Sequence, residues 1–429
     1  MAASAGKPQV YVSTLYFIEG LPYTMVTQMS LVMFKNLGAD NAYIGLVTTY
    51  LTIPWAIKLL WAPFIDQVGT RRGWILVSHM VLAVLTGVLS CLMVVPNANV
   101  LSIVALTSIA FISATQDVAI DGYYMDVLDK EQQALYVGIR GAAYKLAWLV
   151  GSGALVFLAG KIGSSTPLGI RYGWVASFAT CALFLAVACF FHNLILPRPL
   201  EAHKPQIEKT TFSQKVRNFL DVFISYANQD RAHWIFAYIL LFRLGDALMI
   251  KMAQPFLLDG RNLGGLGIPT ENVGIVYGTV GTLSLLVGGI FGSWLISRFG
   301  LKRCLLPAAI FQSSAILLYW ALAKFQPGIE MVAVVNAFEQ FSYGIGCAAY
   351  TIYLMSTVKP EYKASHYAIA TGMMAVGLLV PGMVSGFLTR LGYPTFFLIS
   401  FLASIPGIIT ILFLPFKEEY KAESQPEGS

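Results

Sequence analysis

Charged residues are scarce in this chain of 429 residues, because Asp, Glu, Lys and Arg together make up only 12% of it. An ordinary soluble domain carries roughly 25%. Hydrophobic residues make up 57%, and the mean hydropathy is +0.67. A chain with so few charges cannot cover a water-exposed surface of this size, which excludes a soluble globular protein. The composition therefore predicts a membrane protein that crosses the bilayer many times.

Cysteine and histidine are also scarce, with five of each. The cysteines are scattered through apolar stretches without CxxC or His-paired spacing, so neither a disulfide framework nor a metal site is indicated. No HExxH or GxSxG motif occurs and the histidines are widely spaced, so we expect neither an enzyme nor a cofactor site. No basic stretch alternates with aromatic residues in the manner of a nucleic-acid binding surface.

Apolar windows of about 20 residues, the length that a membrane-spanning helix requires, recur along the chain. We count twelve, at roughly 10–35, 41–65, 73–95, 99–126, 134–160, 169–196, 232–258, 269–297, 301–324, 328–358, 363–391 and 393–416. The longest polar stretch, from Pro197 to Arg231, separates six windows from six. We therefore predict an all-α membrane protein with an N-terminal six-helix bundle (1–196), a cytoplasmic linker (197–231), a C-terminal six-helix bundle (232–417) and a cytoplasmic tail (418–429).

The basic residues between the windows indicate an orientation. With the N-terminus in the cytoplasm, seventeen Lys and Arg residues fall on the cytoplasmic side and six on the other. Such an excess inside the cell is typical of membrane proteins, so we expect both termini in the cytoplasm. The polar segment before the first window is too short for a cleaved signal, and the first spans themselves should direct insertion.

Two loops repeat between the halves. DQVGTRR, from Asp66 to Arg72, follows the second window, and SRFGLKR, from Ser297 to Arg303, follows the eighth. The glycines and the last two basic residues coincide. A parallel duplication of six spans, together with this loop, resembles the two halves of the major facilitator superfamily. Because both loops lie at the predicted cytoplasmic mouth, we expect an inner-gate role for Asp66, Gly69, Arg71, Arg72, Arg298, Gly300 and Arg303.

Two acids lie inside the fourth window, in the segment ATQDVAIDGY that runs from position 114 to 123. Asp117 and Asp121 are four residues apart and so share one helix face. Acids at membrane depth are costly and normally face a bundle interior or a wet cavity. Counted outward from the next turn, Asp121 lies level with Arg140 and Asp117 level with Lys145, while Lys58 reaches a comparable depth from the second window.

These two acids and three bases have two interpretations. They are ion pairs that fix helix packing or lock the inner gate. Alternatively, the excess positive charge binds an anionic substrate while an acid carries a coupling proton. A second polar set lies nearer the membrane midplane, where secondary transporters bind their substrates. It consists of Glu19, the Arg243–Asp246 pair, which could bond to each other on one face, and Glu339.

The candidates are therefore as follows. The acids that could carry a proton are Asp117, Asp121, Glu19 and Glu339. Tyrosines combine an apolar face with a polar edge and could stack on sugar rings, so the candidate substrate-binding residues are Gln116, Arg140, Lys145, Arg243, Lys58, Tyr16, Tyr23 and Tyr144.

Several first-half motifs resemble the AmpG muropeptide permease family. They are KLLWAPFID (58–66), RRGW (71–74), ATQDVAIDGY (114–123), the Gly20-Leu21-Pro22 element and the GIR…YKL stretch at 138–146. That resemblance implies proton-driven import of anhydromuropeptides, N-acetylglucosamine linked to anhydro-N-acetylmuramic acid with or without its peptide, across the bacterial inner membrane. It also implies a role in peptidoglycan recycling and, in some bacteria, in β-lactamase induction.

Other interpretations stay open. The KLLWAP and ATQD elements also resemble the acetyl-coenzyme A transporter family, so acetyl-coenzyme A or another anionic metabolite is an alternative substrate. A non-transporting membrane sensor is a further alternative, although no soluble signalling domain is apparent. For partners we expect an amphipathic sugar-peptide, protons and the lipid bilayer, and we expect a monomer that binds no nucleic acid.

Overall fold

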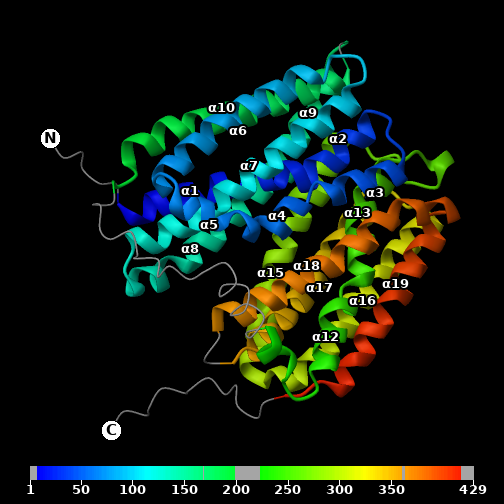
Figure 1. The fold of residues 1–429 in the computed structure, drawn as a ribbon. Coiled ribbons are helices and arrows are strands. Elements are labelled where there is room, and N and C mark those ends of the chain that lie inside the picture. The colour runs from blue at the N-terminus through cyan, green and yellow to red at the C-terminus, as the bar shows by residue number, and fades with distance from the viewer. Residues whose placement is uncertain (1–6, 168, 199–222, 360–362, 417–429) are drawn as a thin grey trace, which may run out of the picture. The chain divides into compact units, whose positions relative to one another are not determined.

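The computed structural model describes residues 7–167, 169–198, 223–359 and 363–416, which are helical and contain no strand within these ranges. Each of the twelve predicted windows is occupied by helix (Figure 1). Most of the predicted linker (199–222) and the whole predicted tail (418–429) lie outside the described residues. The prediction of an all-α protein with helices at every apolar window is confirmed.

The chain forms two compact units. Unit 1 comprises Met1–His203 and Gln254–Thr279, and unit 2 comprises Lys204–Ala253 and Val280–Ser429. The segment 254–279 thus packs with the N-terminal helices, although it follows the predicted linker in the sequence.

The helices of unit 1 follow one another with short connections. They are α1 (Pro8–Thr24), η1 (Met25–Met29), α2 (Ser30–Asn36), α3 (Asn41–Tyr50), α4 (Ile53–Ile57), η2 (Lys58–Leu60), α5 (Ala62–Gln67), α6 (Arg71–Leu92), α7 (Ala98–Val127), α8 (Lys130–Trp148), η3 (Leu149–Leu155), α9 (Val156–Ser165), α10 (Ile170–Ile195), η4 (Arg261–Leu263) and α14 (Thr270–Val273). Helix α1 is central, because it packs against α7, α8 and α10, while α6 and α10 lie side by side (Figure 1).

The helices of unit 2 are α12 (Ala232–Leu241), α15 (Thr282–Phe299), α16 (Leu301–Phe325), α17 (Ile329–Ser356), α18 (Lys363–Leu388), η7 (Thr389–Leu391), α19 (Tyr393–Thr410) and η8 (Ile411–Phe413). Helix α17 packs against α15 and α16, and α12 packs against α18 and α19. Helix α13 (Leu244–Leu258) and the π-helical segment η5 (Gly274–Gly281) belong partly to each unit.

Local sequence signals set the helix ends. Asp40 caps α3 by accepting a hydrogen bond from the Tyr43 amide, 2.7 Å, and Thr70 and Asp129 cap α6 and α8 in the same way. A side-chain oxygen at this position satisfies one of the backbone N–H groups that a helix start leaves without a partner. These caps explain why the turns between spans are short.

Glycines allow the closest helix contacts in unit 1. A Cβ on Gly278 would come within 1.9 Å of the Ser152 carbonyl oxygen, and one on Gly160 would come within 2.1 Å of the Glu271 amide nitrogen. The π-helical segments η3 and η5 both take part in this crossing. The contact joins α9 and η3 to the segment that follows α13, which is why residues 254–279 belong to unit 1.

Eight helices within the described residues are long and apolar enough to cross a membrane. They are Arg71–Leu92, Ala98–Val127, Glu131–Ser165, Ile170–Ile195, Thr270–Phe299, Leu301–Phe325, Ile369–Leu391 and Tyr393–Phe413. The other four predicted windows contain Glu19, Lys58, Arg243 and Glu339 respectively. The spans that fall short of this criterion are therefore among those that carry candidate polar residues.

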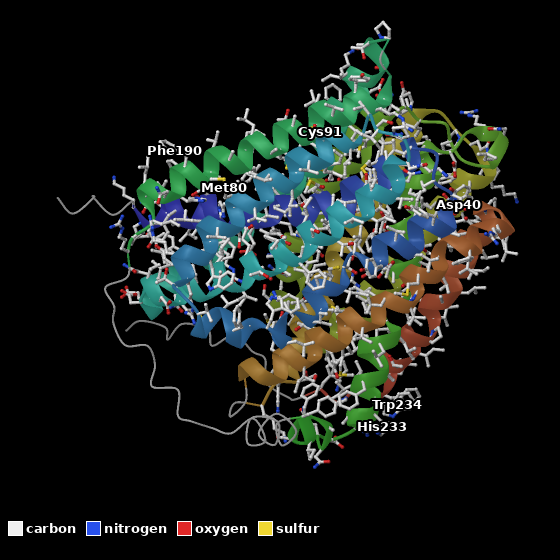
Figure 2. The ribbon with its side chains drawn as sticks, turned by 45° about the horizontal axis from the view of Figure 1, so that its top comes forward. Asp40, Met80, Cys91, Phe190, His233 and Trp234 are labelled. Atoms are coloured by element: carbon white, nitrogen blue, oxygen red, sulfur yellow. The ribbon has the colours of Figure 1, made fainter. Side chains whose placement is uncertain are left out.

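The outer face of α6 and α10 is apolar. Figure 2 shows Met80, Cys91 and Phe190 on the outside of these helices, and Met80 and Phe190 are 55% and 69% exposed. Large apolar side chains on the outside of a helical bundle are expected where lipid replaces water. This face therefore lies against the bilayer, and the chain is a multi-pass membrane protein.

Candidate functional site

Two basic residues lie where a helix is interrupted. Prolines at the second positions of α4 and α5 break the second span, and Lys58 begins the short turn η2 between them. Arg243 lies in the turn between α12 and α13. Proline has no N–H to donate to the preceding turn, so it ends one helix and starts another. Broken helices of this kind line the binding sites of many transporters.

The first group of polar residues is the charged cluster of unit 1, which we define as Glu19, Lys58, Asp117, Asp121 and Arg140. The Lys58 ammonium forms an ion pair with Asp117, and the Glu19 carboxyl group lies close enough to Asp117 to interact with it. Two carboxylates have no donor between them, so a hydrogen bond between Glu19 and Asp117 would need a proton on one of the two. The charged cluster therefore places two acids side by side next to a lysine.

Glu19 is the most buried member of the charged cluster. It is only 6% exposed, and its Oε2 atom has no hydrogen-bond partner among the described residues. The side chains of Lys58 and Asp117 are 28% and 13% exposed. A buried carboxyl oxygen without a donor is costly as a charge.

Asp121 and Arg140 form the second half of the charged cluster. The Arg140 guanidinium lies 3.3 Å from Asp121, and the Tyr16 hydroxyl donates to the same carboxylate oxygen at 2.7 Å. Arg140 also lies over the Tyr16 ring, 4.6 Å from its centre, and 5.7 Å from the centre of the Tyr124 ring. The side chains of Arg140 and Asp121 are 38% and 36% exposed, so both are accessible from the surface of unit 1.

Matching depth in the membrane predicted one ion pair correctly and the other incorrectly. Asp121 meets Arg140, as their matching depths predict, but Asp117 meets Lys58 instead of Lys145. Lys145 lies 5.3 Å from the centre of the Trp148 ring. Arg140 and Lys145 are five residues apart and so point about 140° apart around α8, which prevents both from facing the same helix.

Four aromatic rings gather beside the charged cluster. The Tyr23 ring lies 5.0 Å from Trp55, 6.0 Å from Tyr144 and 6.0 Å from Trp148, measured between ring centres. We call Tyr23, Trp55, Tyr144 and Trp148 the aromatic cluster. Its residues come from α1, α4 and α8, and all four are partly exposed.

Gln116, a predicted substrate-binding residue, lies in a helix contact. It is fully buried, and its amide donates to the Ile18 carbonyl of α1 at 3.4 Å. Its Oε1 atom has no hydrogen-bond partner among the described residues. Its position fixes α7 against α1 and so holds Asp117 and Glu19 near each other.

Unit 2 contains the second polar set. Arg243 donates to the Tyr343 hydroxyl, and Asp246 accepts a hydrogen bond from Gln312. The two residues thus have separate partners, instead of the mutual bond that their spacing allowed. Glu339 accepts a hydrogen bond of 2.8 Å from Gln340, its neighbour in α17, and both Glu339 and Asp246 are buried.

The first repeated loop is tied down within unit 1. Gly69 has φ +72°, a conformation that glycine adopts without strain. Arg71 bonds to the Gly122 carbonyl at 2.8 Å and to Asp126 at 2.6 Å, both at the end of α7. Arg72 bonds to the Asn193 carbonyl at the end of α10, 2.6 Å. The side chain of Asp66 lies outside the described structure.

The second repeated loop shares a positive φ at its glycine, but its helix start and its contacts differ. Gly300 has φ +84°, and α16 begins directly after it, whereas Thr70 separates Gly69 from the start of α6. Arg298 lies beside the Trp294 and Phe299 rings, 6.0 Å from each ring centre, and both Arg298 and Arg303 are exposed. The sequence repeat therefore corresponds to a repeated turn whose basic residues have different partners in the two units.

The family model of the Major Facilitator Superfamily matches residues 12–286 and 247–429. The chain belongs to the major facilitator superfamily. The predicted fold of two related six-helix halves is thereby confirmed, and the chain is a member of a transporter superfamily.

The chain is similar to several bacterial members of the superfamily. It is 29% identical to the anhydromuropeptide permease of Escherichia coli (strain K12), over 93% of this chain and 78% of that protein. It is 23% identical to the putative transporter AmpG 4 of Rickettsia conorii, over 93% of this chain and 94% of that protein. The predicted resemblance to AmpG-type permeases is confirmed.

Solved structures show the same fold. The D-xylose-proton symporter matches with a TM-score of 0.72 at 12% identity, over 94% of this chain and 96% of that one. The nucleoside transporter NupG matches with a TM-score of 0.68 at 16% identity, over 94% of this chain and 98% of that one. At such low identity the likeness concerns the facilitator fold alone.

Sequence reasoning missed a polar cluster in unit 1 of this facilitator, at the end opposite the repeated loop. Lys35 forms an ion pair of 2.5 Å with Asp259 and donates to Asn41 at 2.8 Å. Asn36 donates to Thr270 at 2.9 Å. Asp259 follows α13 directly, and a carboxylate at a span end is the signal that could have pointed to it. These bonds tie the segment 254–279 to α2.

Sequence reasoning also missed a buried pair of histidines. His79 Nε2 lies 2.9 Å from His192 Nδ1, His192 Nε2 lies 2.9 Å from the Thr14 hydroxyl, and His79 Nδ1 lies 2.7 Å from the Ile75 carbonyl. The carbonyl only accepts, so with both rings neutral His79 donates to Ile75 and His192 donates to His79. The Thr14 hydroxyl also has the Val10 carbonyl as an acceptor, 2.8 Å away, so its single proton serves either Val10 or His192. This chain joins α1, α6 and α10.

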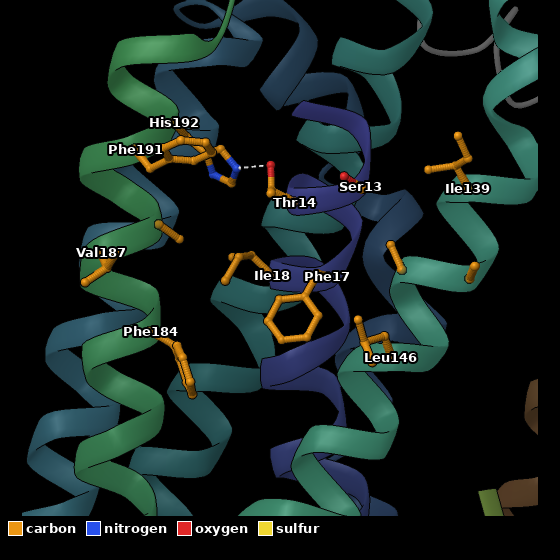
Figure 3. A pocket seen from close by; sticks show the side chains of 13 residues that line it. Ser13, Thr14, Phe17, Ile18, Ile139, Leu146, Phe184, Val187, Phe191 and His192 are labelled. Carbon is orange, nitrogen blue, oxygen red and sulfur yellow. Dashed lines mark hydrogen bonds between the residues drawn. The ribbon is translucent and has the colours of Figure 1, made fainter. Parts of the chain in front are cut away.

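His192 and Thr14 lie at the wall of an apolar groove of about 630 Å³ between α1, α8 and α10. Figure 3 shows their hydrogen bond, with the other labelled side chains around it: Ser13, Phe17, Ile18, Ile139, Leu146, Phe184, Val187 and Phe191. Leu146 and Val187 are more than half exposed, so the groove opens on the outside of the bundle. It lies on a face of α8 different from that of Arg140 and Tyr144.

Proposed function

We propose that this facilitator is a proton-coupled importer of anhydromuropeptides in the bacterial inner membrane, with both termini in the cytoplasm. The single observation that carries the proposal is the charged cluster of unit 1, in which the neighbouring acids Glu19 and Asp117 lie beside the partly exposed basic groups of Lys58 and Arg140. The Escherichia coli relative is named as an anhydromuropeptide permease, which supports this substrate class. The excess of basic residues in the predicted cytoplasmic segments supports the orientation.

The charges of the cluster give a reason for coupling. The charged cluster holds three acids, Glu19, Asp117 and Asp121, and two bases, Lys58 and Arg140. Lys145, on another face of α8, adds a third base nearby, so the charges balance when all six groups are ionised. A proton shared by Glu19 and Asp117 leaves one positive charge in excess. The protonated cluster therefore attracts an anion, and release of the proton removes that attraction. This is a coupling free energy between two ligands, which is reciprocal by thermodynamic necessity.

The substrate groups fit the residues that remain accessible. Arg140 offers a planar guanidinium that can bind a carboxylate through two parallel hydrogen bonds, and Lys145 offers a second cationic group. Peptide carboxylates of an anhydromuropeptide are the matching anions. Asp121 and Tyr16 hold the Arg140 side chain in position, because both contact it directly in unit 1.

The residues of unit 2 have a secondary role in this proposal. Arg243 would hold a second anionic group after exchanging the Tyr343 hydroxyl for substrate, and Glu339 would provide an alternative proton site after exchanging Gln340. The repeated loops would act at the inner gate, with Arg71 and Arg72 holding the ends of α7 and α10 together.

The test is uptake by the purified protein in proteoliposomes under an inward proton gradient, with labelled anhydromuropeptide and labelled acetyl-coenzyme A in parallel. We expect saturable uptake of the muropeptide that a protonophore abolishes, and no uptake of acetyl-coenzyme A. Uptake of acetyl-coenzyme A without uptake of the muropeptide would show that acetyl-coenzyme A is the substrate. Uptake of neither, with no counterflow of preloaded muropeptide, would contradict transport and favour a sensor.

A further inference from the structure

The aromatic cluster lies one helical turn from the charged cluster on each helix that contributes to both. Tyr23 follows Glu19 by four residues on α1, and Tyr144 follows Arg140 by four residues on α8. One turn of helix advances about 5.4 Å. The two clusters therefore form adjacent layers of unit 1, one charged and one aromatic.

Close packing of α1 on α8 brings the two layers into register. A Cβ on Gly20 would lie 2.9 Å from the Ala147 side chain and 3.1 Å from the Tyr144 carbonyl. Only glycine lets the helices approach so closely, and Tyr23 is then held against Tyr144 and Trp148. On the second span, Trp55 precedes Lys58 by three residues, so the same order of layers recurs there.

The α8 side of the aromatic cluster borders open space. A Cβ on Gly141 would meet no atom within 4 Å. Lys145 and Trp148 follow Gly141 by four and seven residues and so lie on the same face of α8. Ile139 and Ala143, which line the apolar groove, lie on the opposite face. The gap beside Gly141 is therefore bordered by an aromatic ring and an ammonium group.

We propose that the aromatic cluster is a subsite for a pyranose ring, which lies in the open space beside Gly141 with its apolar face on the exposed part of the cluster. Anionic groups of the same ligand would then reach Lys145 and, one turn away, Arg140. This inference rests on the proposed function and deepens it, because it assigns the sugar and the carboxylates to separate layers.

The physical reason is the chemistry of sugars. One face of a pyranose carries mainly C–H groups, and an indole ring offers a large flat surface with an electron-rich face for them. A charged layer alone would hold any anion of suitable size, including a free peptide. Two layers about one turn apart select a ligand that carries both a sugar ring and a nearby carboxylate.

The first experiment compares two competitors for uptake of labelled anhydromuropeptide in proteoliposomes. One is the disaccharide without peptide, and the other is the free peptide. For Trp55→Leu and Trp148→Leu we expect the inhibition constant of the disaccharide to rise about tenfold, which corresponds to the loss of one good aromatic contact. The constant of the free peptide should stay within twofold of the wild type. Equal changes for both competitors, or no change for either, would overturn the subsite.

The control for these variants is Trp294→Leu, because Trp294 lies on α15 in unit 2 and is 49% exposed. We expect it to leave both inhibition constants unchanged. Melting temperatures in detergent identify any variant that is simply misfolded, and the disaccharide-to-peptide ratio is compared only among folded variants.

The second experiment fills the gap. Gly141→Leu should raise the inhibition constant of the disaccharide, as the tryptophan variants do. The melting temperature of this variant should stay close to that of the wild type, because no atom lies within 4 Å of the new Cβ. Gly87→Leu on α6 is the matched control, since a Cβ there also meets no atom within 4 Å. Normal disaccharide inhibition in a folded Gly141→Leu protein would contradict the proposal.

The two proposals fail in different ways. If the wild-type protein does not take up anhydromuropeptide, the proposed function fails and the subsite fails with it. If the wild-type protein takes up anhydromuropeptide and both competitors inhibit uptake by the variants as they inhibit the wild type, only the subsite is wrong. Expected results in both experiments support the two layers together.

Discussion

The polar residues of the two units differ in how they are satisfied. In unit 1, Asp117 and Asp121 each contact more than one polar group, and the cluster includes partly exposed side chains. In unit 2, Asp246 and Glu339 are buried, and each accepts a hydrogen bond from a neutral amide. Polar groups with one fixed neutral partner stabilise a helix bundle. Accessible groups that share protons and charges are able to exchange them with a ligand.

The difference assigns transport chemistry mainly to unit 1 and helix packing mainly to unit 2. Both units place a basic residue at a helix interruption, Lys58 in one and Arg243 in the other. Lys58 contacts the carboxylate of Asp117, whereas Arg243 contacts a phenol. We therefore expect changes in unit 1 to affect coupling and affinity, and changes in unit 2 to affect stability first.

The largest effect should follow from Asp117→Asn. The amide keeps the shape but cannot take up the proton that Glu19 and Asp117 share, so gradient-driven accumulation should fall by up to about 150-fold, the upper range of an ordinary coupling free energy. Accumulation in proteoliposomes measures it. Counterflow without a gradient should persist, and Asp230→Asn, at an exposed position before α12, serves as the control. Normal accumulation by Asp117→Asn would end its coupling role.

The second effect concerns Arg140. Arg140→Ala should weaken binding of carboxylated substrates about tenfold, because a charge-assisted hydrogen bond is worth roughly 1.5–3 kcal/mol. Neutral sugars should lose little affinity. Competition assays with both ligand types provide the measurement, and Arg140→Lys should recover part of the affinity. An equal loss for charged and neutral ligands would instead identify a structural ion pair with Asp121.

A third prediction tests unit 2. Arg243→Ala should destabilise the protein by about 1–3 kcal/mol, because it leaves the Tyr343 hydroxyl without its donor. Thermal unfolding in detergent measures the change, and Tyr343→Phe in the same chain should add little to it. Arg298→Ala, in an exposed position, should leave stability unchanged. Lost uptake with an unchanged melting temperature would show that Arg243 binds substrate directly.

The smallest effect belongs to the histidine chain. His192→Ala removes two hydrogen bonds between α1, α6 and α10, and such bonds in membrane proteins average about 0.6 kcal/mol each. We expect a small decrease in melting temperature and normal uptake. His192→Gln, which can still bond to Thr14, should recover part of the loss. A coupling defect in His192→Ala would place a transport function on the groove side of unit 1.

Much of the fold follows from patterns that are local in the sequence. Each apolar window is long enough to span a membrane, and Asp40, Thr70 and Asp129 mark helix starts by their capping side chains. The repeated loops predicted a duplicated turn, and Gly69 and Gly300 both have a positive φ there. These features depend on neighbours in the chain, which is why the sequence alone predicts them.

The site was predictable only in part. Counting residues outward from the turn between α7 and α8 correctly placed Asp121 beside Arg140, because both lie on helices of one hairpin. The same counting missed the Lys58–Asp117 pair, since two prolines break the second span and change where Lys58 points. Rotation about a helix axis and the position of a break are not fixed by depth.

The sequence by itself determined the twelve apolar windows, the membrane location and the presence of buried acids and bases, because hydrophobicity and charge are properties of each residue. Tertiary structure established which charges meet, and that His79 and His192 form a chain from positions 113 residues apart. It also decided that residues 254–279 pack with the N-terminal helices. These outcomes depend on helix rotation and close packing at glycines, which only the folded protein specifies.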